Sequence, residues 1–398
     1  MKNGAPFTNR ILMSNLLEDI RVLDFTHVWF GPYCTMMLAE LGADVIKVEP
    51  PWGTIGRLGP GAIYKGVSTT FYSLNLNKKD IAVDMKSEEG LSIVKELVRR
   101  SDVVVQNFVP GTLERLGLSY EVQKELNPRI IYAALSGFGQ SGPYSRYASY
   151  ASVAEAMAGY TFANARRVRG EGPPVGMPGA LGDLGPAMYA AFTIVAALRH
   201  RDKTGKGQMI DVNQYDCMVA FNTCSSVGYH LWAKDGLERP ERRMDPTSVG
   251  GMYKVSDGWI MVMGARARAL DSLKAALGVE ELDKEMLSEY VKDMTRKEAF
   301  DFLAKTGFPA APVNEAHEAM DDPHLQARGM WAEVDHPAAG KYKAPNFPVK
   351  LSETPGGVLS AAPMLGQHTE EVLTNMLDYS QEQIKELEKA NKIACWRV

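Results

Sequence analysis

The chain has 398 residues, of which 45% are hydrophobic and 23% are charged, an ordinary composition for a folded protein with one large core and a smaller one. Its formal net charge of −4 gives no bulk attraction to nucleic acid or to an anionic membrane, so neither is an expected partner. Four scattered cysteines, no signal-peptide pattern and no run of about 18 apolar residues predict a cytoplasmic protein without a membrane span.

A strand-helix-strand pattern follows an N-terminal extension. The apolar run 21–25 predicts a strand, and Gly31-Pro32 precedes an expected helix over 33–41, with Pro32 suited to a first helical turn. Residues 44–49 predict a second, buried strand. A helix that joins two strands in this way indicates a parallel sheet.

The same alternation continues to about residue 230. The remaining expected helices cover 88–100, 120–126, 184–201 and 214–226, and the remaining strands cover 103–105, 130–135 and 209–212. The composition then changes: a charged loop over 237–250, a strand over 259–263 and helices over 267–277 and 296–306 indicate a smaller α+β domain. A last amphipathic helix is expected over 380–391.

Several common catalytic motifs are absent. There is no G-x-G-x-x-G after the first strand, no Walker A loop and no G-x-S-x-G elbow, which disfavours nicotinamide-, nucleotide- and serine-dependent enzymes. The seven histidines lack the spacing of metal ligands, so no metal site is expected.

Asp183 opens the expected helix of residues 184–201 and has two interpretations. Apolar residues recur at helical spacing after it and predict a buried helix face, formed by Leu184, Met188, Phe192, Val195 and Leu198. As the residue before the helix, Asp183 suits an N-cap that accepts a backbone N–H. The same position favours an ionised carboxylate, which can attack a thioester. The local pattern fits both roles.

Several stretches of the chain together resemble the class III coenzyme A-transferases, the family that includes formyl-CoA transferase. Their order and spacing carry the resemblance, which runs from about residue 21 to residue 330. The stretches are VLDFTHVWFGP, ELGADVIKVEPP, NLNKKDIAVDMK, VVVQNFVPGTLERLG, LNPRIIYAALSGFGQSGPY, GDLGPAMYAAFTIVAALRHRDKTGKGQMIDV and APVNEAHEAMDDPHLQARGM.

The resemblance implies an α/β fold: a Rossmann-like large domain over 1–228 and 326–398, with a small domain over 229–325. It implies two interlocked subunits, as a homodimer, although a heteromer stays open. It implies that Asp183 carries the acyl group, that an acyl-CoA donor and a carboxylic acid acceptor are the substrates, and that no cofactor is bound permanently.

The resemblance also places CoA along the loops that follow the first strands. Lys86 and Arg115 suit the CoA phosphates, although each is equally an ordinary surface cation. A glycine loop at Gly250 and Gly251 is expected to cover the aspartate. The CoA-binding positions that the resemblance implies are Trp29, Phe30, Val83, Lys86, Asn107, Phe108, Arg115 and Gly137.

Two departures from formyl-CoA transferase concern the substrate. Trp29 stands where that enzyme has a glutamine and Ala151 where it has a glutamate. The bulky indole of Trp29 favours a larger or more apolar acyl group. Tyr144, Tyr147 and Tyr150 are candidates to line the acyl group's site. Arg166, Arg167, Arg169, Arg242 and Arg243 are candidates to meet a second carboxylate, or form exposed charge clusters.

The expected chemistry is a mixed anhydride on Asp183 followed by an aspartyl-CoA thioester. Three alternatives remain: CoA transfer between two carboxyls of one diacid, an acyl-CoA racemase, and a non-enzymatic CoA-binding subunit. The racemases carry a histidine soon after the glycine-rich turn, and residues 147–151 contain none.

Overall fold

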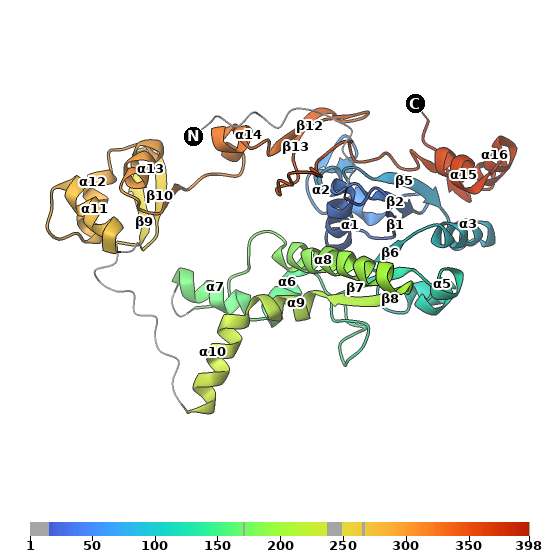
Figure 1. Cartoon of the computed structure of the whole chain (residues 1–398), viewed down its shortest axis with the longest axis horizontal. Coiled ribbons are helices and arrows are strands. Elements are labelled where there is room, and N and C mark those ends of the chain that lie inside the picture. Colours follow the sequence, from blue (N-terminus) through green and yellow to red (C-terminus); the bar gives the residue numbers. More distant parts are fainter. Residues whose placement is uncertain (1–15, 170–171, 237–248, 265–266, 398) are drawn as a thin grey trace. The chain divides into compact units, whose positions relative to one another are not determined.

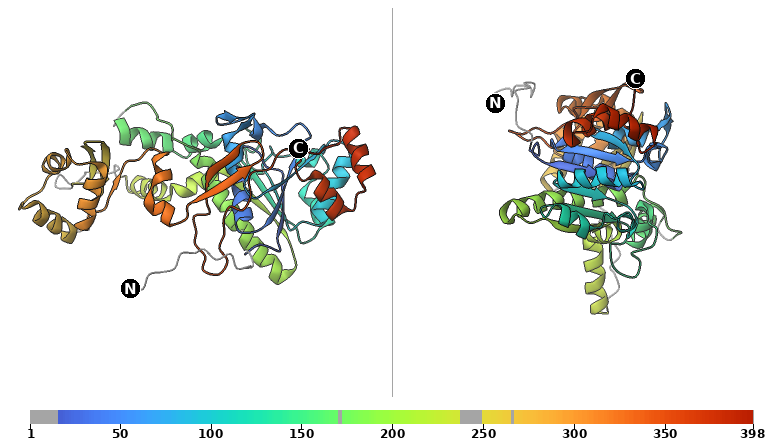
Figure 2. Two further views of the ribbon diagram at one scale, coloured as in Figure 1. Left: turned by 90° about the horizontal axis from the view of Figure 1, so that it is seen from above. Right: turned by 90° about the vertical axis from the view of Figure 1, so that its right-hand side faces the viewer.

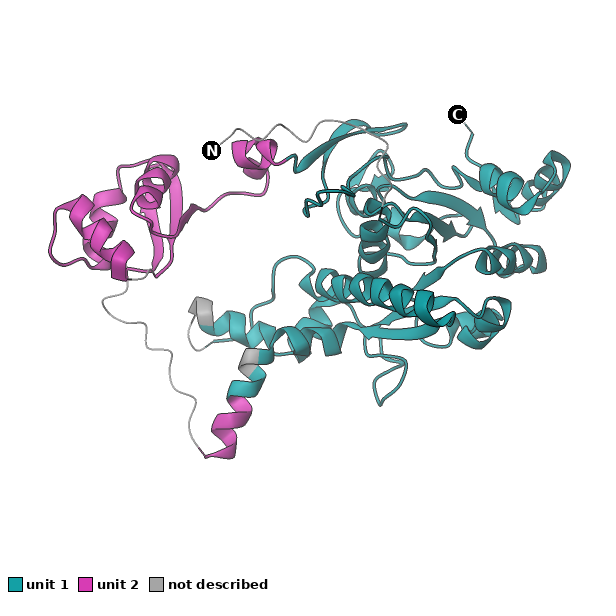
Figure 3. Cartoon of the chain, viewed as in Figure 1, with its two compact units in different colours: residues 1–228, 329–398 teal, residues 229–328 magenta. Residues whose placement is uncertain are grey.

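The structure is a computed structural model that describes residues 16–169, 172–236, 249–264 and 267–397. It divides into two compact units (Figure 3). Unit 1 comprises residues 1–228 and 329–398, and unit 2 comprises residues 229–328. The chain therefore leaves unit 1 once, builds unit 2, and returns.

Unit 1 is built on a seven-stranded sheet with the order β14-β5-β2-β1-β6-β7-β8 (Figure 1). Every neighbouring pair is parallel except β14 and β5, so the alternation of strands and helices correctly predicted an α/β fold. The strands are β1 (Arg21–Asp24), β2 (Asp44–Glu49), β5 (Lys79–Val83), β6 (Val103–Gln106), β7 (Ile131–Ser136), β8 (Gln208–Asn213) and β14 (Ile393–Ala394).

Helices cover both faces of this sheet (Figures 1 and 2). Successive strand residues point to opposite faces, so Val22 packs under α1 (Phe30–Glu40) and α8 (Leu181–Thr204), whereas Leu23 packs under α3 (Glu88–Arg99). The C-terminal helices α15 (Thr369–Leu377) and α16 (Gln381–Lys389) join the α3 face. Figure 2 shows them, in red, beside α3, a segment far away in the sequence.

Shorter elements complete unit 1. They are β3 (Ile63–Tyr64), β4 (Val67–Ser68), η1 (Ile55–Arg57), α2 (Thr69–Leu74), α4 (Thr112–Arg115), α5 (Tyr120–Leu126), α6 (Ala151–Met157), α7 (Tyr160–Arg169), α9 (Gln214–Phe221), β12 (Trp331–His336) and β13 (Gly340–Pro345). Helix α10 (Thr223–Lys234) crosses from unit 1 into unit 2. The single helix expected over 214–226 is thus two helices that meet at Asn222.

Unit 2 has its own core on an antiparallel three-stranded sheet, which agrees with the α+β expectation for this region. Its core gathers apolar side chains such as Ile260, Leu273 and Leu303 from the sheet and its helices. The elements are β9 (Gly251–Val255), β10 (Gly258–Val262), α11 (Ala267–Leu277), α12 (Lys284–Val291), α13 (Arg296–Lys305), β11 (Ala310–Pro312), η2 (Glu318–Asp321) and α14 (Pro323–Ala327).

The buried face that the sequence predicted for α8 is only partly correct. Leu198 is buried and Leu184 is half-buried, but Met188, Phe192 and Val195 are exposed. Small residues such as Ala187 and Ala190 form much of the face that packs inside unit 1. Small residues occupy this face because they allow α8 to pack closely against α1 and the sheet. By length and composition alone α8 would also suffice to cross a bilayer, but half of its most apolar window is buried inside the protein.

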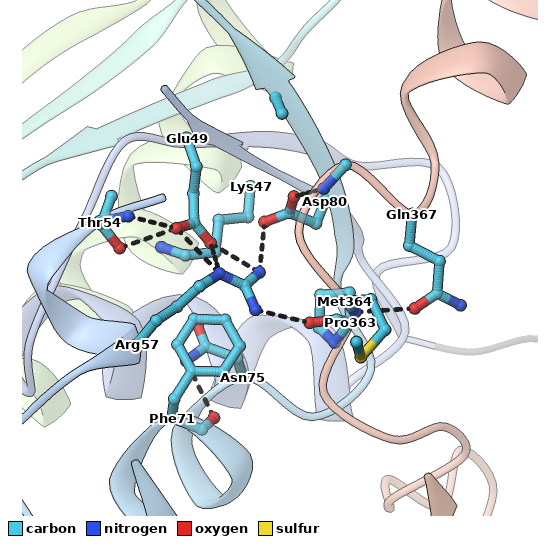
Figure 4. A network of polar contacts seen from close by, with 12 residues as sticks. Lys47, Glu49, Thr54, Arg57, Phe71, Asn75, Asp80, Pro363, Met364 and Gln367 are labelled. Atoms are coloured by element: carbon cyan, nitrogen blue, oxygen red, sulfur yellow. Dashed lines mark hydrogen bonds and ion pairs between the residues drawn. The ribbon is translucent and has the colours of Figure 1, made fainter. Parts of the chain in front are cut away.

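A buried charge network joins distant segments of unit 1 (Figure 4). The Arg57 guanidinium lies 2.9 Å from Glu49 and 3.2 Å from Asp80, stacks 4.0 Å from the centre of the Phe71 ring, and donates to the Pro363 carbonyl. Burial would raise the pKa of Glu49, but Lys47 and Arg57 lower it to about 2. Burial and the Glu49 carboxylate raise the pKa of Asp80 well above 3.8.

We expect Arg57→Ala to lower the free energy of unfolding by about 3–5 kcal/mol, because it leaves a buried carboxylate without its cation. Thermal unfolding followed by circular dichroism measures the loss. Arg397→Ala is the control: it removes a 2.7 Å ion pair with Glu388 at an exposed site and leaves the midpoint unchanged. Equal midpoints for the two variants would contradict a structural role for the network.

Candidate active site

A small cavity of about 90 Å³ lies at the carboxyl edge of the parallel sheet of unit 1. Its lining residues come from the segments that follow β1, β6, β7 and β8, together with the starts of α6 and α8. They are His27, Val28, Trp29, Phe30, Asn107, Leu135, Ser136, Gly137, Ser149, Tyr150, Asp183 and Gln214.

The strand order explains why these segments meet. The chain moves from β1 to β2 and β5 on one side, and then from β6 to β7 and β8 on the other. The loops after β1 and β6 therefore diverge and leave a crevice at the carboxyl ends of these two strands, where ligands bind in open α/β sheets. Of the predicted site residues, this edge brings together Trp29, Phe30, Asn107, Gly137 and Asp183.

Asp183 is not the N-cap of α8. The helix begins at Leu181 after the backbone of Ala180, and Asp183 is its third residue. The capping role falls instead to Glu155 of α6, whose side chain is 2% exposed and accepts the Gly182 N–H at 2.9 Å. The local pattern left open whether Asp183 caps the helix or acts as a reactive carboxylate. Because Glu155 accepts the Gly182 amide, Asp183 is not needed to cap the helix.

Gly182 makes this arrangement sterically feasible. A Cβ at this position would lie 2.5 Å from the Ala151 carbonyl oxygen, so any side chain would push α6 away. Ala151 and Glu155 are four residues apart on α6 and therefore lie on the same helix face.

The Asp183 carboxyl is nearly buried, with 9% of the residue exposed, and is held from one side. Gln214, directly after β8, donates from Nε2 to Oδ1 at 2.5 Å, and Ser149 donates to Gln214 Oε1 at 3.0 Å. Among the described residues no donor reaches Oδ2. Gln214 thus orients Oδ1, while Oδ2 remains available to a ligand in the cavity that Asp183 lines.

Burial raises the pKa of Asp183 to about 6, opposed by the Gln214 hydrogen bond and reinforced by the Glu155 carboxyl. Desolvation therefore outweighs the helix dipole and the Gln214 donor in setting the pKa of this carboxyl. The group is still mostly ionised at pH 7, and its anion is poorly solvated, which favours nucleophilic attack.

The loop after β1 forms a tightly constrained wall of the cavity. His27 donates its backbone N–H to Asn107 Oδ1, and Asn107 Nδ2 donates back to the His27 carbonyl, both at 2.9 Å. Burial, together with the charge of Lys47, lowers the pKa of His27 to about 4, so its imidazole is neutral at pH 7. Val28 has a φ of 68°, a strained backbone for a β-branched residue.

Four predicted CoA-binding residues lie outside this cavity. Val83 is fully buried in the core at the end of β5, and Phe108 is half-buried against that core, with its ring 5.5 Å from the His27 ring. Lys86 and Arg115 are exposed on loops and helix ends of the same sheet edge. The structure therefore leaves both cations accessible, and excludes the Val83 side chain from ligand contact.

Other candidate residues are only partly placed. Of the three tyrosines, Tyr150 lines the cavity, whereas Tyr144 and Tyr147 stack on each other 5.4 Å apart without lining it. Gly250 and Gly251 belong to unit 2, at the start of β9. Arg166 is exposed on α7; Arg242 and Arg243 lie outside the described residues, as do the side chains of Arg167 and Arg169. Within the described ranges no three His, Cys, Asp or Glu side chains cluster as metal ligands do.

The site residues that the sequence did not reveal include His27, Ser149, Glu155 and Gln214. Gln214 carried a usable signal, since it stands directly after a predicted parallel strand, where polar side chains meet ligands. His27 stood inside the first stretch of the resemblance. Glu155 carried none, because only the packing of α6 on α8 brings it to the site.

We expect Asp183→Asn to stabilise the protein much more at pH 8 than at pH 4. The folded pKa of about 6 exceeds the ordinary 3.8, so the carboxyl costs nothing below pH 3.8, where it is protonated in both the folded and the unfolded state. Its cost grows as pH rises from 3.8 to 6 and is complete above 6. The gain at pH 8 is on the order of 3 kcal/mol, seen as a higher thermal midpoint.

Gln214→Leu should have the opposite effect on stability. It removes the hydrogen bond to the ionised Asp183 carboxylate, so it should lower the thermal midpoint more at pH 8 than at pH 4. Shifts of equal size at both pH values in the two variants would show that the charge of Asp183 does not affect stability.

Comparison with known proteins identifies the family. The model of CoA-transferase family III matches residues 17–369. The chain is 33% identical over 395 residues to the β subunit of succinyl-CoA–L-malate CoA-transferase from Chloroflexus aurantiacus, covering 93% of this chain and 96% of that protein. It is 32% identical to formyl-CoA:oxalate CoA-transferase from Streptomyces coelicolor, covering 96% and 100%.

A crystal structure gives the same result for the fold. A CAIB/BAIF family protein from Brucella suis superposes with a TM-score of 0.77 at 30% identity, covering 91% of this chain and 99% of that one. The family model spans both units, and the relatives match over nearly their whole length. The chain therefore belongs to CoA-transferase family III and is an enzyme that transfers CoA between acyl-CoA thioesters and carboxylates.

Proposed function

We propose that Asp183 is the group through which CoA is transferred, as a transient acyl-aspartyl anhydride and aspartyl-CoA thioester. The observation that carries this proposal is the hydrogen bonding at the start of α8. Glu155 accepts the backbone amide of Gly182, and Asp183 lines the cavity with no described donor at its Oδ2. An ionised carboxylate of this kind is a competent nucleophile for an acyl carbonyl.

The proposed reaction balances without a proton or cofactor. Asp183 Oδ2 attacks the thioester carbonyl, the C–S bond breaks, and CoA thiolate leaves a mixed anhydride. The thiolate then attacks the aspartyl carbonyl and releases the donor carboxylate, which gives the aspartyl-CoA thioester. The acceptor carboxylate repeats the sequence in reverse, and the new acyl-CoA leaves with Asp183 restored.

Two features of the cavity support these steps. Gln214 fixes Oδ1, which directs the attack to Oδ2 and limits the number of carboxylate rotamers. The wall of α1 offers backbone N–H groups of its first turn, since the helix has no side-chain cap. Such amides suit the oxyanion that forms at the attacked carbonyl.

CoA itself is proposed to lie along the carboxyl edge of the sheet. Asn107 and Gly137 line the cavity that would receive the thioester end, while Lys86 and Arg115 are exposed at the same edge and suit the phosphates. The Phe108 ring, half-buried beside His27, is available to the adenine or pantetheine portion. Gly250 and Gly251 are retained as the proposed covering loop.

Two other activities would use the same cavity. Intramolecular CoA transfer within one diacid needs no added acceptor, so dependence on an acceptor acid separates it from the proposed reaction. The position of His27 in the cavity gives some support to a racemase, because an imidazole and Asp183 together make an acid–base pair. Exchange of the α-hydrogen of a chiral acyl-CoA with deuterated water would reveal that chemistry.

Asp183→Ala is expected to lose at least about a thousand-fold of transfer activity while CoA still binds, because only the covalent step is removed. Hydroxylamine added during turnover should convert the acyl-aspartyl species to a hydroxamate on the peptide that contains position 183, seen by mass spectrometry.

Asp211→Asn is the matched control. Asp211 lies at the same sheet edge and accepts the Gln140 N–H at 2.9 Å, but it does not line the cavity. Transfer should stay within a few-fold in this variant. Retained transfer in Asp183→Ala, or a hydroxamate at another position, would reject the proposed role of Asp183.

We also propose that a second copy of the chain covers the exposed face of α8. Met188, Phe192 and Val195 recur at helical spacing and are 57%, 72% and 37% exposed, although the opposite face of the helix is buried. A helix that is apolar on all sides is normally buried on all sides. One relative is named as a β subunit, so a different partner chain is the competing outcome.

The purified chain should sediment at twice its own mass, and Phe192→Lys should shift it towards the monomer by placing a charge in the interface. Leu58→Lys, at an equally exposed apolar residue of unit 1 (73%), should leave the dimer intact. A monomer at micromolar concentration that still transfers CoA would contradict the proposed dimer.

A further inference from the structure

Asp24, Lys47 and Lys78 are three charged side chains buried around the carboxyl end of β1. An ammonium group is rarely buried completely unless it is paired. Lys78 follows this rule, because its Nζ lies 3.0 Å from Asp24 Oδ2 and 2.9 Å from Asn75 Oδ1. It also donates to a backbone carbonyl, that of Pro32, at 3.0 Å. The charge of Lys78 and all three of its N–H donors therefore have partners.

Lys47 is buried without a paired carboxylate. The residue is 1% exposed, and in the part of the chain that the structure describes it forms no ion pair. Glu49, two residues along the same face of β2, pairs with Arg57 instead (Figure 4). The contact that Lys47 makes is with the backbone, because its Nζ donates to the Thr26 carbonyl at 2.5 Å. A cation that is buried against one carbonyl indicates that the position of this carbonyl matters.

The Thr26 carbonyl belongs to a loop whose backbone is held by side chains. Asp24 Oδ1 accepts the Thr26 N–H at 2.8 Å, and Lys47 donates to the carbonyl of the same residue. Asn107 Oδ1 accepts the His27 N–H, and Asn107 Nδ2 donates to the His27 carbonyl, both at 2.9 Å. Both polar backbone groups of two consecutive residues are thus fixed by side chains, outside any helix or strand.

The residues directly after this pair lie at the cavity. Val28 has a φ of 68°, a conformation that a β-branched residue keeps only where its surroundings impose it. Val28 and Trp29 both line the cavity, and no acceptor for either backbone N–H occurs among the described residues. Two such amides suit the oxyanion that attack by Asp183 creates at the acyl carbonyl. Their direction depends on how firmly Thr26 and His27 are held.

We propose that Lys47 is a positioning residue for CoA transfer, whose buried ammonium holds the Thr26 carbonyl and thereby keeps the two amides in place at the cavity. The inference rests on the proposed function of Asp183 and adds a residue that does not itself line the cavity. An ammonium suits this task better than a neutral donor, because charge-assisted hydrogen bonds are about twice as strong as neutral ones.

Lys47→Met tests the inference, because it removes the ammonium and keeps an unbranched side chain of similar length. The amides act on the oxyanion and not on bound acyl-CoA. The rate constant of adduct formation at Asp183 should therefore fall about 100-fold, while the acyl-CoA concentration that half-saturates it changes less than about three-fold. Single turnovers with acetyl-CoA and succinyl-CoA as donors, trapped with hydroxylamine, measure both quantities.

A fluorine NMR signal from Trp29 reports on the loop itself. When 5-fluorotryptophan replaces the 6 tryptophans, the Trp29 resonance is the one that is lost in Trp29→Phe. This resonance should shift or broaden in Lys47→Met, because the loop is no longer held at Thr26.

Arg201→Met is the matched control. Arg201 is also a buried cation of unit 1, with its guanidinium 2.6 Å from Asp102, but it lies in the last turn of α8, at the opposite end of the helix from Asp183. Its loss should lower the thermal midpoint, keep the rate of adduct formation within about two-fold and leave the Trp29 resonance unchanged.

Lys47→Gln is the second variant, for the case that Lys47→Met does not fold. It keeps a donor for the Thr26 carbonyl without the charge, and the adduct rate should fall about ten-fold. An unchanged rate in a folded Lys47 variant would overturn the inference, as would equal changes in Arg201→Met. An unchanged Trp29 resonance would overturn it too, since Lys47 would then act only through its charge on nearby carboxylates.

The role of Asp183 is tested separately by the same trapping experiment. If the unmodified enzyme forms an adduct at Asp183 and the Lys47 variants form it equally fast, the inference fails and the proposed function stands. If no adduct forms from either donor in the unmodified enzyme, the proposed role of Asp183 fails, and the inference with it.

Discussion

The hydrogen bond between the Glu155 carboxylate and the Gly182 amide is the contact on which the site depends. A helix start leaves several amides unsatisfied, and the nearest carboxylate normally takes one of them. If Asp183 accepted one of these amides, its carboxylate oxygens would be hydrogen-bonded to the backbone and less available to a substrate. Because α6 supplies a different carboxylate, and because Gly182 has no side chain to keep α6 away, the helix is capped and Asp183 remains chemically available.

Glu155 also affects the ionisation of Asp183. The charge of Glu155 and the burial of the site both raise the pKa of Asp183 towards neutrality, while the hydrogen bond from Gln214 lowers it. The outcome is a carboxylate that ionises at physiological pH but is held in a poorly solvated, single-donor setting. The desolvated Asp183 carboxylate lowers the stability of the fold, and it is also a reactive anion. Such a loss of stability is common at strained or desolvated active sites.

Most of the sheet was predictable, because buried parallel strands and amphipathic helices leave periodic patterns. β2, α5 and α11 were predicted at their observed bounds. For α8, three residues of the predicted buried face are exposed, because apolar periodicity shows which residues avoid water but not which neighbour shields them. Within the site, Asp183, Trp29 and Gly137 followed from the resemblance. Glu155 did not, since its role exists only through the packing of α6 on α8.

The Arg57 network has a consequence for how the protein is made. Arg57 and Asp80 are translated early, yet their partners Pro363 and Gly366 emerge only after the whole of unit 2 has left the ribosome. Until then, Arg57 lacks the Pro363 carbonyl, Asp80 lacks the Gly366 amide, and the edge strand β5 lacks β14. The nascent sheet therefore stays partly hydrated and open at one edge during the synthesis of unit 2, which has its own core and can fold before the sheet is complete.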